Sequence, residues 1–175
     1  PMMDWTDRHC RYFHRKFTKK SLLYTEMVAS AALVKGKAFH LLDNSNEEHP
    51  VALQLGGSDP AQLSEAASIG EDHGYNEINL NVGCPSDRVQ SGDFGAVLMK
   101  NPKLVAKCCE AMNKNTSVDI TVKCRIGVDD QNPYQILPEF LKYLCDAGIT
   151  RVIIHARKAI LKGLSPKENR DVPPL

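Results

Sequence analysis

The sequence predicts an α/β fold with a parallel sheet, and three observations favour a TIM (β/α)8 barrel over an open doubly wound sheet. Short apolar runs alternate with amphipathic segments of about 10 to 15 residues, which is the pattern of βαβ units. No G-x-G-x-x-G turn follows the first strand, as it would in a dinucleotide-binding sheet. Polar residues also recur at the carboxyl ends of four successive predicted strands, as they do in the active sites of TIM barrels.

Five segments have the apolar, β-branched composition of strands: residues 22–27, 51–55, 77–82, 120–125 and 151–156. Residues 1–3 resemble the end of one further strand before them. A complete barrel needs about 250 residues. The chain has 175 residues. We therefore expect only the N-terminal portion of a barrel, about strands 1 to 6, in a fragment of a larger enzyme.

Amphipathic segments between these strands predict helices over residues 7–17, 30–42, 60–72, 102–113 and 133–146. Pro60 and Pro102 suit the first turns of their helices, and Gly74 and Gly148 suit C-terminal caps. Pro138 conflicts with a helix interior, a conflict that a helix beginning two residues before it would remove.

The composition excludes several classes of protein. Lys and Arg number 22 against 21 Asp and Glu, a net charge of +1, and 42% of the residues are hydrophobic. These values exclude a disordered, collagen-like or coiled-coil chain and a bulk polycation. No apolar run approaches the roughly 18 residues of a membrane span, and no signal peptide is visible, so we expect a cytoplasmic protein without a membrane partner. Six cysteines without a C-x-x-C pair or zinc-type histidine spacing predict neither a metal site nor a disulfide framework.

The polar residues at strand ends form pairs with i, i+2 spacing, which places both side chains of a pair on one face of a strand. They are Gln54, Asn79 with Asn81, Lys123 with Arg125, and His155 with Arg157. Each alone could be an ordinary loop residue. Their recurrence on four consecutive strands favours an active site at this end of the sheet.

Cys84 lies in a Gly-Cys-Pro turn directly after an apolar strand, where its thiol is presented rather than packed. A thiol there can act as an acid or a nucleophile, and Arg88 could stabilise the thiolate. The alternative is a buried loop cysteine. Cys108, Cys109 and Cys145 lie within predicted helices, and we expect them to be small hydrophobic residues.

Several separated motifs, in order along essentially the whole chain, resemble the tRNA-dihydrouridine synthases, most closely their A subfamily. The block from Asn81 to Arg88, Asn-Val-Gly-Cys-Pro-Ser-Asp-Arg, is the most diagnostic. The other motifs are Pro1-Met2-Met3-Asp4-Trp5-Thr6-Asp7-Arg8, Gln54-Leu55-Gly56-Gly57, Lys123-Cys124-Arg125-Ile126-Gly127, His155-Ala156-Arg157 and Ser165-Pro166-Lys167-Glu168-Asn169-Arg170.

The resemblance implies an FMN-dependent oxidoreductase that reduces uridine to 5,6-dihydrouridine in the D-loop of tRNA with NADPH. Residues 1–175 would be part of the flavin-binding TIM-barrel catalytic domain. The last barrel strands, whose loops hold the FMN phosphate, and a helical tRNA-binding domain would be absent. We therefore expect this polypeptide alone to bind FMN weakly or not at all, and the enzyme to be a monomer.

The resemblance also assigns roles to residues that match its motifs. Cys84 would be the catalytic acid, protonating C5 of uracil after hydride reaches C6 from FMN. The cofactor-binding residues would be Pro1, Met2, Met3, Gln54, Lys123 and His155. The residues that contact the uracil or the tRNA would be Asn81, Arg157, Lys167 and Arg170, and no metal is implied.

Two stretches are locally basic. Residues 151–170 contain six Lys and Arg against one acid, and residues 7–20 contain six against Asp7. The first stretch borders the predicted site, so we expect it to contact phosphates and to make RNA binding salt dependent. For residues 15–20 a solvated helix face is the better interpretation.

Three alternatives remain at the level of sequence. A flavin barrel acting on small molecules, such as an ene-reductase or dihydroorotate dehydrogenase, would share the cofactor residues. A barrel lyase would use Lys123 to form a Schiff base. An inactive, truncated RNA-binding fragment would have no catalytic chemistry.

Overall fold

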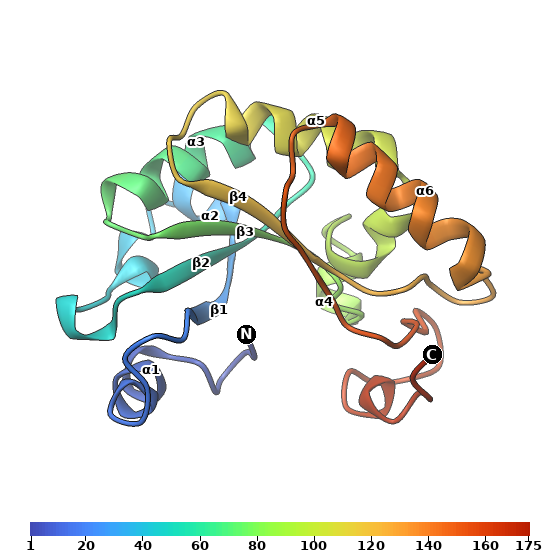
Figure 1. Cartoon of the computed structure of the whole chain (residues 1–175), viewed down its shortest axis with the longest axis horizontal. Coiled ribbons are helices and arrows are strands. Elements are labelled where there is room, and N and C mark those ends of the chain that lie inside the picture. Colours follow the sequence, from blue (N-terminus) through green and yellow to red (C-terminus); the bar gives the residue numbers. More distant parts are fainter.

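A five-stranded parallel sheet, with its strands in sequence order, organises the chain in this computed structural model (Figure 1). The structure describes residues 1–175, except for the side chain of Arg88. The strands are β1 (Leu23–Ala29), β2 (Val51–Gly56), β3 (Glu77–Val82), β4 (Asp119–Cys124) and β5 (Val152–Ile154). Sequential parallel pairing is the arrangement of a barrel wall, and it confirms the predicted N-terminal part of a TIM barrel.

The ends of the predicted strands need two corrections. Residues 1–3 form no strand, because Met2 O accepts hydrogen bonds from the backbone N–H groups of Trp5 and Thr6 and closes a turn. β5 ends at Ile154, so His155 and Arg157 lie in the loop that follows the strand.

Helices connect the strands: α1 (Arg8–Arg15), α2 (Ser30–Val34), α3 (Pro60–Asp72), α4 (Asp87–Gln90), α5 (Pro102–Asn113) and α6 (Pro133–Asp146). Figure 1 shows α3, α5 and α6 in a row over one face of the sheet, while both chain ends lie on the other side. The predictions for α3, α5 and α6 are confirmed residue for residue, and Gly74 and Gly148 have the expected positive φ angles of 82° and 84°.

One predicted helix, residues 30–42, was wrong in part, and the later helix start that would have removed the Pro138 conflict does not occur. The segment 30–42 is not one helix, because α2 ends at Val34 and Lys37 adopts a left-handed φ of 51° before a 3-10 turn over Phe39–Leu42. α6 begins at Pro133, where the side chain of Asn132 accepts from Tyr134 N, so Pro138 lies inside the helix. A proline there lacks the N–H that would bond to the preceding turn.

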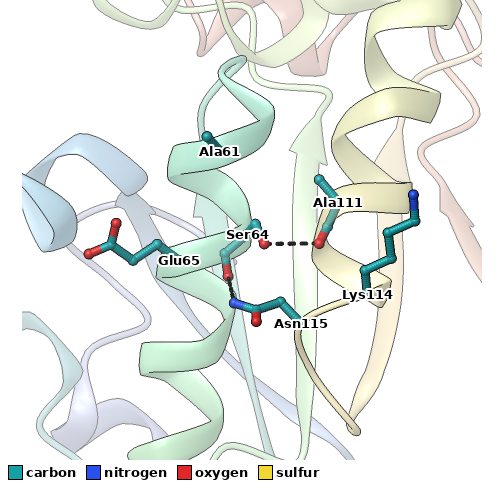
Figure 2. A pocket seen from close by; sticks show the side chains of 6 residues that line it. All are labelled: Ala61, Ser64, Glu65, Ala111, Lys114 and Asn115. Carbon is teal, nitrogen blue, oxygen red and sulfur yellow. Dashed lines mark hydrogen bonds between the residues drawn. The ribbon is translucent and has the colours of Figure 1, made fainter.

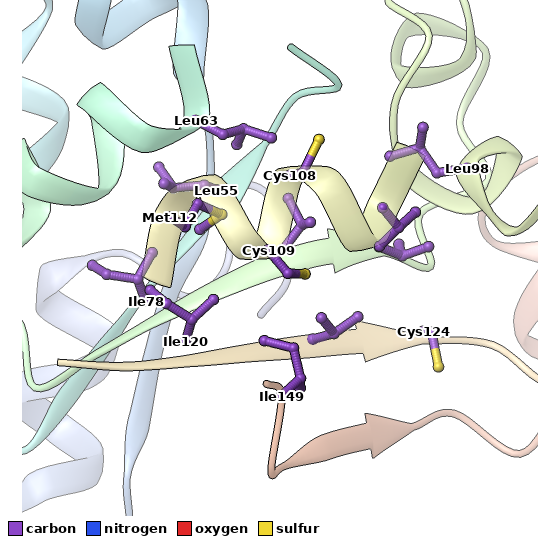
Figure 3. Close-up of a cluster of buried hydrophobic side chains, with 14 of the residues drawn as sticks. Leu55, Leu63, Ile78, Leu98, Cys108, Cys109, Met112, Ile120, Cys124 and Ile149 are labelled. Atoms are coloured by element: carbon purple, nitrogen blue, oxygen red, sulfur yellow. The ribbon is translucent and has the colours of Figure 1, made fainter. Parts of the chain in front are cut away.

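The main core lies between the sheet and its covering helices (Figure 3). Leu55, Ile78 and Ile120 point outward from three strands and pack with residues of α3 and α5. Cys108 and Cys109 are fully buried in this core, as expected for small hydrophobic residues, and burial raises the pKa of each thiol to about 12. Cys145 is instead exposed on α6, so its predicted packing role is wrong.

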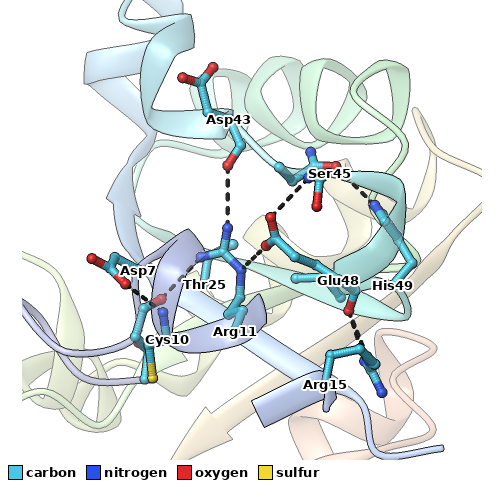
Figure 4. Close-up of polar contacts among 12 residues, drawn as sticks. Asp7, Cys10, Arg11, Arg15, Thr25, Asp43, Ser45, Glu48 and His49 are labelled. Atoms are coloured by element: carbon cyan, nitrogen blue, oxygen red, sulfur yellow. Dashed lines mark hydrogen bonds and ion pairs between the residues drawn. The ribbon is translucent and has the colours of Figure 1, made fainter. Parts of the chain in front are cut away.

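A buried ion pair attaches α1 to the rest of the fold (Figure 4). Arg11 Nε donates to Glu48 Oε2 at 2.7 Å, and both side chains are nearly inaccessible to solvent. Arg11 also donates to the backbone oxygens of Thr6 and Asp43. Arg15 donates to the backbone oxygens of Glu48 and Pro50, so it does not lie on the predicted solvated face.

No helix among the described residues is long and apolar enough to cross a bilayer. No cluster of three His, Cys, Asp or Glu side chains in this part of the chain is arranged to hold a metal ion.

Candidate active site

The inner face of the sheet carries a hydrogen-bonded group of amide side chains. Gln54 on β2 donates from Nε2 to Asn79 Oδ1 at 2.7 Å, and Asn81 donates from Nδ2 to Gln54 Oε1 at 2.8 Å. All three are at most 8% exposed. Asn79 and Asn81 therefore share one face of β3, as their spacing predicts, and a closed hydrogen-bond network offsets the cost of burying them.

Cys84 is held at the carboxyl end of β3 by bonds to its backbone. Asn81 Oδ1 accepts from the N–H of Gly83 at 3.1 Å and of Cys84 at 2.9 Å, while Cys84 O accepts from Ala96 N at 2.9 Å. Cys84 is half-buried, and its Sγ atom lies 3.5 Å from Ser86 Oγ. The backbone of the cysteine is thus fixed and the residue is only partly buried, whereas the predicted partner side chain, Arg88, lies outside the described residues.

Gly95 keeps the loop close to this cysteine. Its φ is +77°, and a Cβ atom there would lie 2.6 Å from Cys84 O. Only glycine fits both the backbone conformation and the space.

Four basic side chains gather around the ends of β4 and β5. Lys123 and Arg125 both lie near Cys84, and burial and the charges of Arg125, Lys123 and Arg157 lower the pKa of the His155 ring. Burial, followed by the charge of Arg125, lowers the pKa of Lys123. No carboxylate among the described residues forms an ion pair with Lys123, Arg125 or Arg157. This end of the sheet consequently carries a concentration of positive charge next to a thiol, suited to an anionic ligand.

Arg125, at 5% exposure, joins two loops of the site. It donates to Gly83 O in the cysteine loop and to the backbone oxygens of Lys158 and Asn169 in the loop after β5. Asn169, fully buried, bonds through its amide to the N–H and the C=O of Ile160. Arg125 was predicted among the strand-end residues of the site without an assigned role, and Asn169 was not assigned one, although an amide within a basic loop was a visible signal.

The remaining predicted residues lie at the same end of the sheet. The backbone nitrogen of Pro1 lies near the Lys123 amine. Arg170 donates to Met2 Sδ at 3.8 Å, and Met3 is half exposed. Lys167 is exposed directly before the short turn Glu168–Arg170.

Three side chains that were predicted to bind a ligand already form hydrogen bonds within the protein: Gln54, Asn81 and Arg157. The amide of Gln54 bonds to Asn79 and Asn81, and the oxygen of Asn81 bonds to the cysteine loop. Arg157 Nε donates to Val172 O, which leaves the outer guanidinium nitrogens for other partners. In this structure, the amides organise the site as well as lining it.

A shallow hollow of 580 Å³ between α3 and α5 lies away from these residues (Figure 2). Ser64 Oγ donates to Ala111 O across it at 2.9 Å, and Asn115 Nδ2 donates to Ser64 O. These bonds join two helices on the outer face of the sheet. The hollow therefore has a structural explanation and is not the candidate active site.

His155 is expected to remain a neutral imidazole across the physiological range. Burial, followed by the charges of Arg125 and Lys123, lowers its pKa from 6.5 to about 4. The unfolded chain takes up this proton at higher pH, so the contribution of this group to stability is lost as pH falls from 6.5 towards about 4. An NMR titration of the His155 ring should give a midpoint near 4.

Arg157→Gln should move that midpoint upward, because one positive charge near the ring is lost, whereas Arg8→Gln on the distant α1 should not. A midpoint near 6.5 in the unsubstituted protein would contradict the arrangement of cations described above.

Comparison with known proteins agrees with this geometry. The sequence profile of the family described as dihydrouridine synthase (Dus) matches residues 1–175. The tRNA-dihydrouridine(20/20a) synthase of Vibrio parahaemolyticus is 58% identical over 176 residues, covering 100% of this chain and 54% of that protein. The proteins with the same name from Salmonella typhi and Escherichia coli K12 are each 60% identical over 100% of this chain, which covers 53% and 51% of their lengths.

The chain thus spans about half the length of the curated relatives it matches. Both the match to the family profile and the identity to these relatives extend over every element that builds the candidate site. The chain therefore belongs to the dihydrouridine synthase family.

Proposed function

We propose that the protein containing this chain reduces uridine to 5,6-dihydrouridine in the D-loop of tRNA, using FMN and NADPH. The observation that carries the proposal is the half-buried Cys84 beside unpaired cations at the carboxyl ends of parallel strands. The relatives named tRNA-dihydrouridine synthases support the substrate.

The residues present fit a flavin. Lys123 supplies a positive charge from the inner face of β4. Burial lowers the pKa of its amine, and an anionic partner would stabilise the charged form. His155 offers a neutral imidazole that can donate or accept a hydrogen bond. Lys123, His155, Gln54 and residues 1–3 would hold the isoalloxazine ring and its ribityl chain. A flavin with negative charge near N1 and O2 needs such donors.

Bound there, FMN would supply the hydride that adds to C6 of uracil, with NADPH as the reductant. Cys84 then donates its Sγ proton to C5, which completes saturation of the C5–C6 bond. Lys123 and Arg125 stabilise the thiolate left on Cys84 after this transfer. Arg157, Lys167 and Arg170 contact RNA phosphates around a uridine that has left its stack.

The test is reduction of an unmodified tRNA transcript by the complete protein with FMN and NADPH, read as dihydrouridine by mass spectrometry of D-loop fragments. We expect dihydrouridine in the D-loop and no reduction of free uridine. A yellow protein that reduces free uracil or small enones but not tRNA would instead favour a small-molecule flavin enzyme.

A further inference from the structure

A ladder of buried polar side chains extends from the cysteine loop to the opposite end of β3. Beyond Gln54 and Asn81, Asn79 Nδ2 donates to Thr121 Oγ1 at 2.8 Å, and Thr121 Oγ1 donates to Glu77 Oε1. Glu77 is 2% exposed and Thr121 is 1% exposed. We call this chain the polar ladder; its members are Glu77, Thr121, Asn79, Gln54 and Asn81.

The groups at the two ends of the polar ladder fix which atom donates and which accepts in each of its hydrogen bonds. A carboxylate such as Glu77 only accepts, so the single hydroxyl proton of Thr121 goes to it. Asn79 must then present its NH2 group to Thr121. The backbone N–H groups of Gly83 and Cys84 only donate, so Asn81 must present its oxygen to them.

The groups around the Glu77 carboxylate are hydrogen-bond donors or cations, which favour its ionised, accepting form. Arg151 Nη1 lies 3.0 Å from Glu77 Oε2, and the Tyr24 hydroxyl donates to Oε1 at 3.1 Å. Burial, followed by the charge of Glu77, raises the pKa of Tyr24 to about 12, so the phenol stays protonated. All groups that bond to this carboxylate among the described side chains donate to it.

We propose that Glu77 and Thr121 are positioning residues for Cys84, acting through the polar ladder to keep the oxygen of Asn81 facing the Cys84 N–H. Without the Thr121 hydroxyl, Asn79 Nδ2 has no acceptor and its amide is free to reverse. Only the N–H groups of Gly83 and Cys84 then hold the direction of the polar ladder, so the reversed arrangement of Asn79, Gln54 and Asn81 becomes less unfavourable and the Cys84 loop is held less firmly. The catalytic part of this proposal rests on the proposed function.

The test compares Thr121→Val with Thr121→Ser in the complete protein. Valine keeps the shape but removes the hydroxyl, whereas serine keeps the hydroxyl and loses a buried methyl group. A purely structural role predicts that both variants lose function with stability. A positioning role predicts that Thr121→Ser retains the function that Thr121→Val loses. The matched control is Thr116→Val, because Thr116 bonds only to Met112 O at the end of α5.

The first measurement is the rate of alkylation of Cys84 by iodoacetamide, resolved by peptide mass spectrometry from the exposed Cys145. For Thr121→Val we expect this rate to change about fivefold or more, the worth of one hydrogen bond. In tRNA reduction we expect kcat to fall about tenfold with KM little changed, since a displaced acid affects the transition state rather than binding. Thr121→Ser and Thr116→Val should retain the rates of the unsubstituted protein.

The proposal is overturned if Thr121→Val changes neither rate, or if Thr121→Ser loses as much as the valine variant. Should the valine variant fail to fold, Glu77→Gln replaces it, since glutamine offers both donor and acceptor and no longer fixes the direction. An unchanged Cys84 alkylation rate there also overturns the proposal. If tRNA is not reduced by the unsubstituted protein, the proposed function fails, but the alkylation rates still decide the role of the ladder.

Discussion

Replacing Cys84 with serine is expected to slow reduction of tRNA uridine by about 10²- to 10⁴-fold, the contribution of a positioned general acid. The serine hydroxyl is a far weaker acid than the thiol, so C5 is no longer protonated efficiently. The bonds that hold residue 84 come from its backbone, to Asn81 and Ala96, and are unaffected by the substitution.

The measurement is single-turnover reduction of a tRNA transcript, with thermal unfolding and flavin absorbance recorded for each variant. Cys145→Ser is the matched control, because that thiol is exposed on α6, on the outer face of the sheet. Activity of Cys84→Ser within a few-fold of the unsubstituted protein would exclude Cys84 as the acid.

Replacing Glu48 with alanine is expected to have the largest effect on stability, lowering the free energy of unfolding by about 3 to 5 kcal/mol. The substitution leaves the Arg11 guanidinium buried at 5% exposure without its counter-charge. It also removes the carboxylate oxygen that accepts from Ser45 N and closes the capping box of the turn.

Chemical denaturation of the complete protein would measure this loss. Arg11→Met combined with Glu48→Leu should recover part of it, because no buried charge then remains unpaired. Lys142→Ala is the control, since its ion pair with Asp146 is exposed on α6 and should contribute little. A Glu48→Ala variant as stable as this control would show that the buried pair does not anchor α1.

The sheet and its long helices were predictable because their signals are local. Alternation along β3 separates outward Ile78 and Leu80 from inward Asn79 and Asn81, and Pro60 and Pro102 mark helix starts. The prediction of one helix over residues 30–42 was wrong because Lys37 has a left-handed backbone conformation. That conformation is rare for lysine, so the residue type does not indicate it.

The candidate site was predictable as a set of strand ends, but the partners of its side chains were not. Arg11 and Glu48 are separated by 37 positions, and Thr121 and Glu77 by 44. Such pairings depend on strand register and loop path, which composition does not encode. The same alternation that exposes Asn79 and Asn81 to the inner face also includes Glu77, so this residue could have been found.

Arg125 links two loops of the candidate site. Its guanidinium bonds to Gly83 on one side and to Lys158 and Asn169 on the other. The cysteine loop and the basic loop after β5 are therefore coupled through one buried side chain. Under the proposed function, the loop that would contact RNA phosphates and the backbone beside the proposed acid, Cys84, therefore depend on the same guanidinium for their positions.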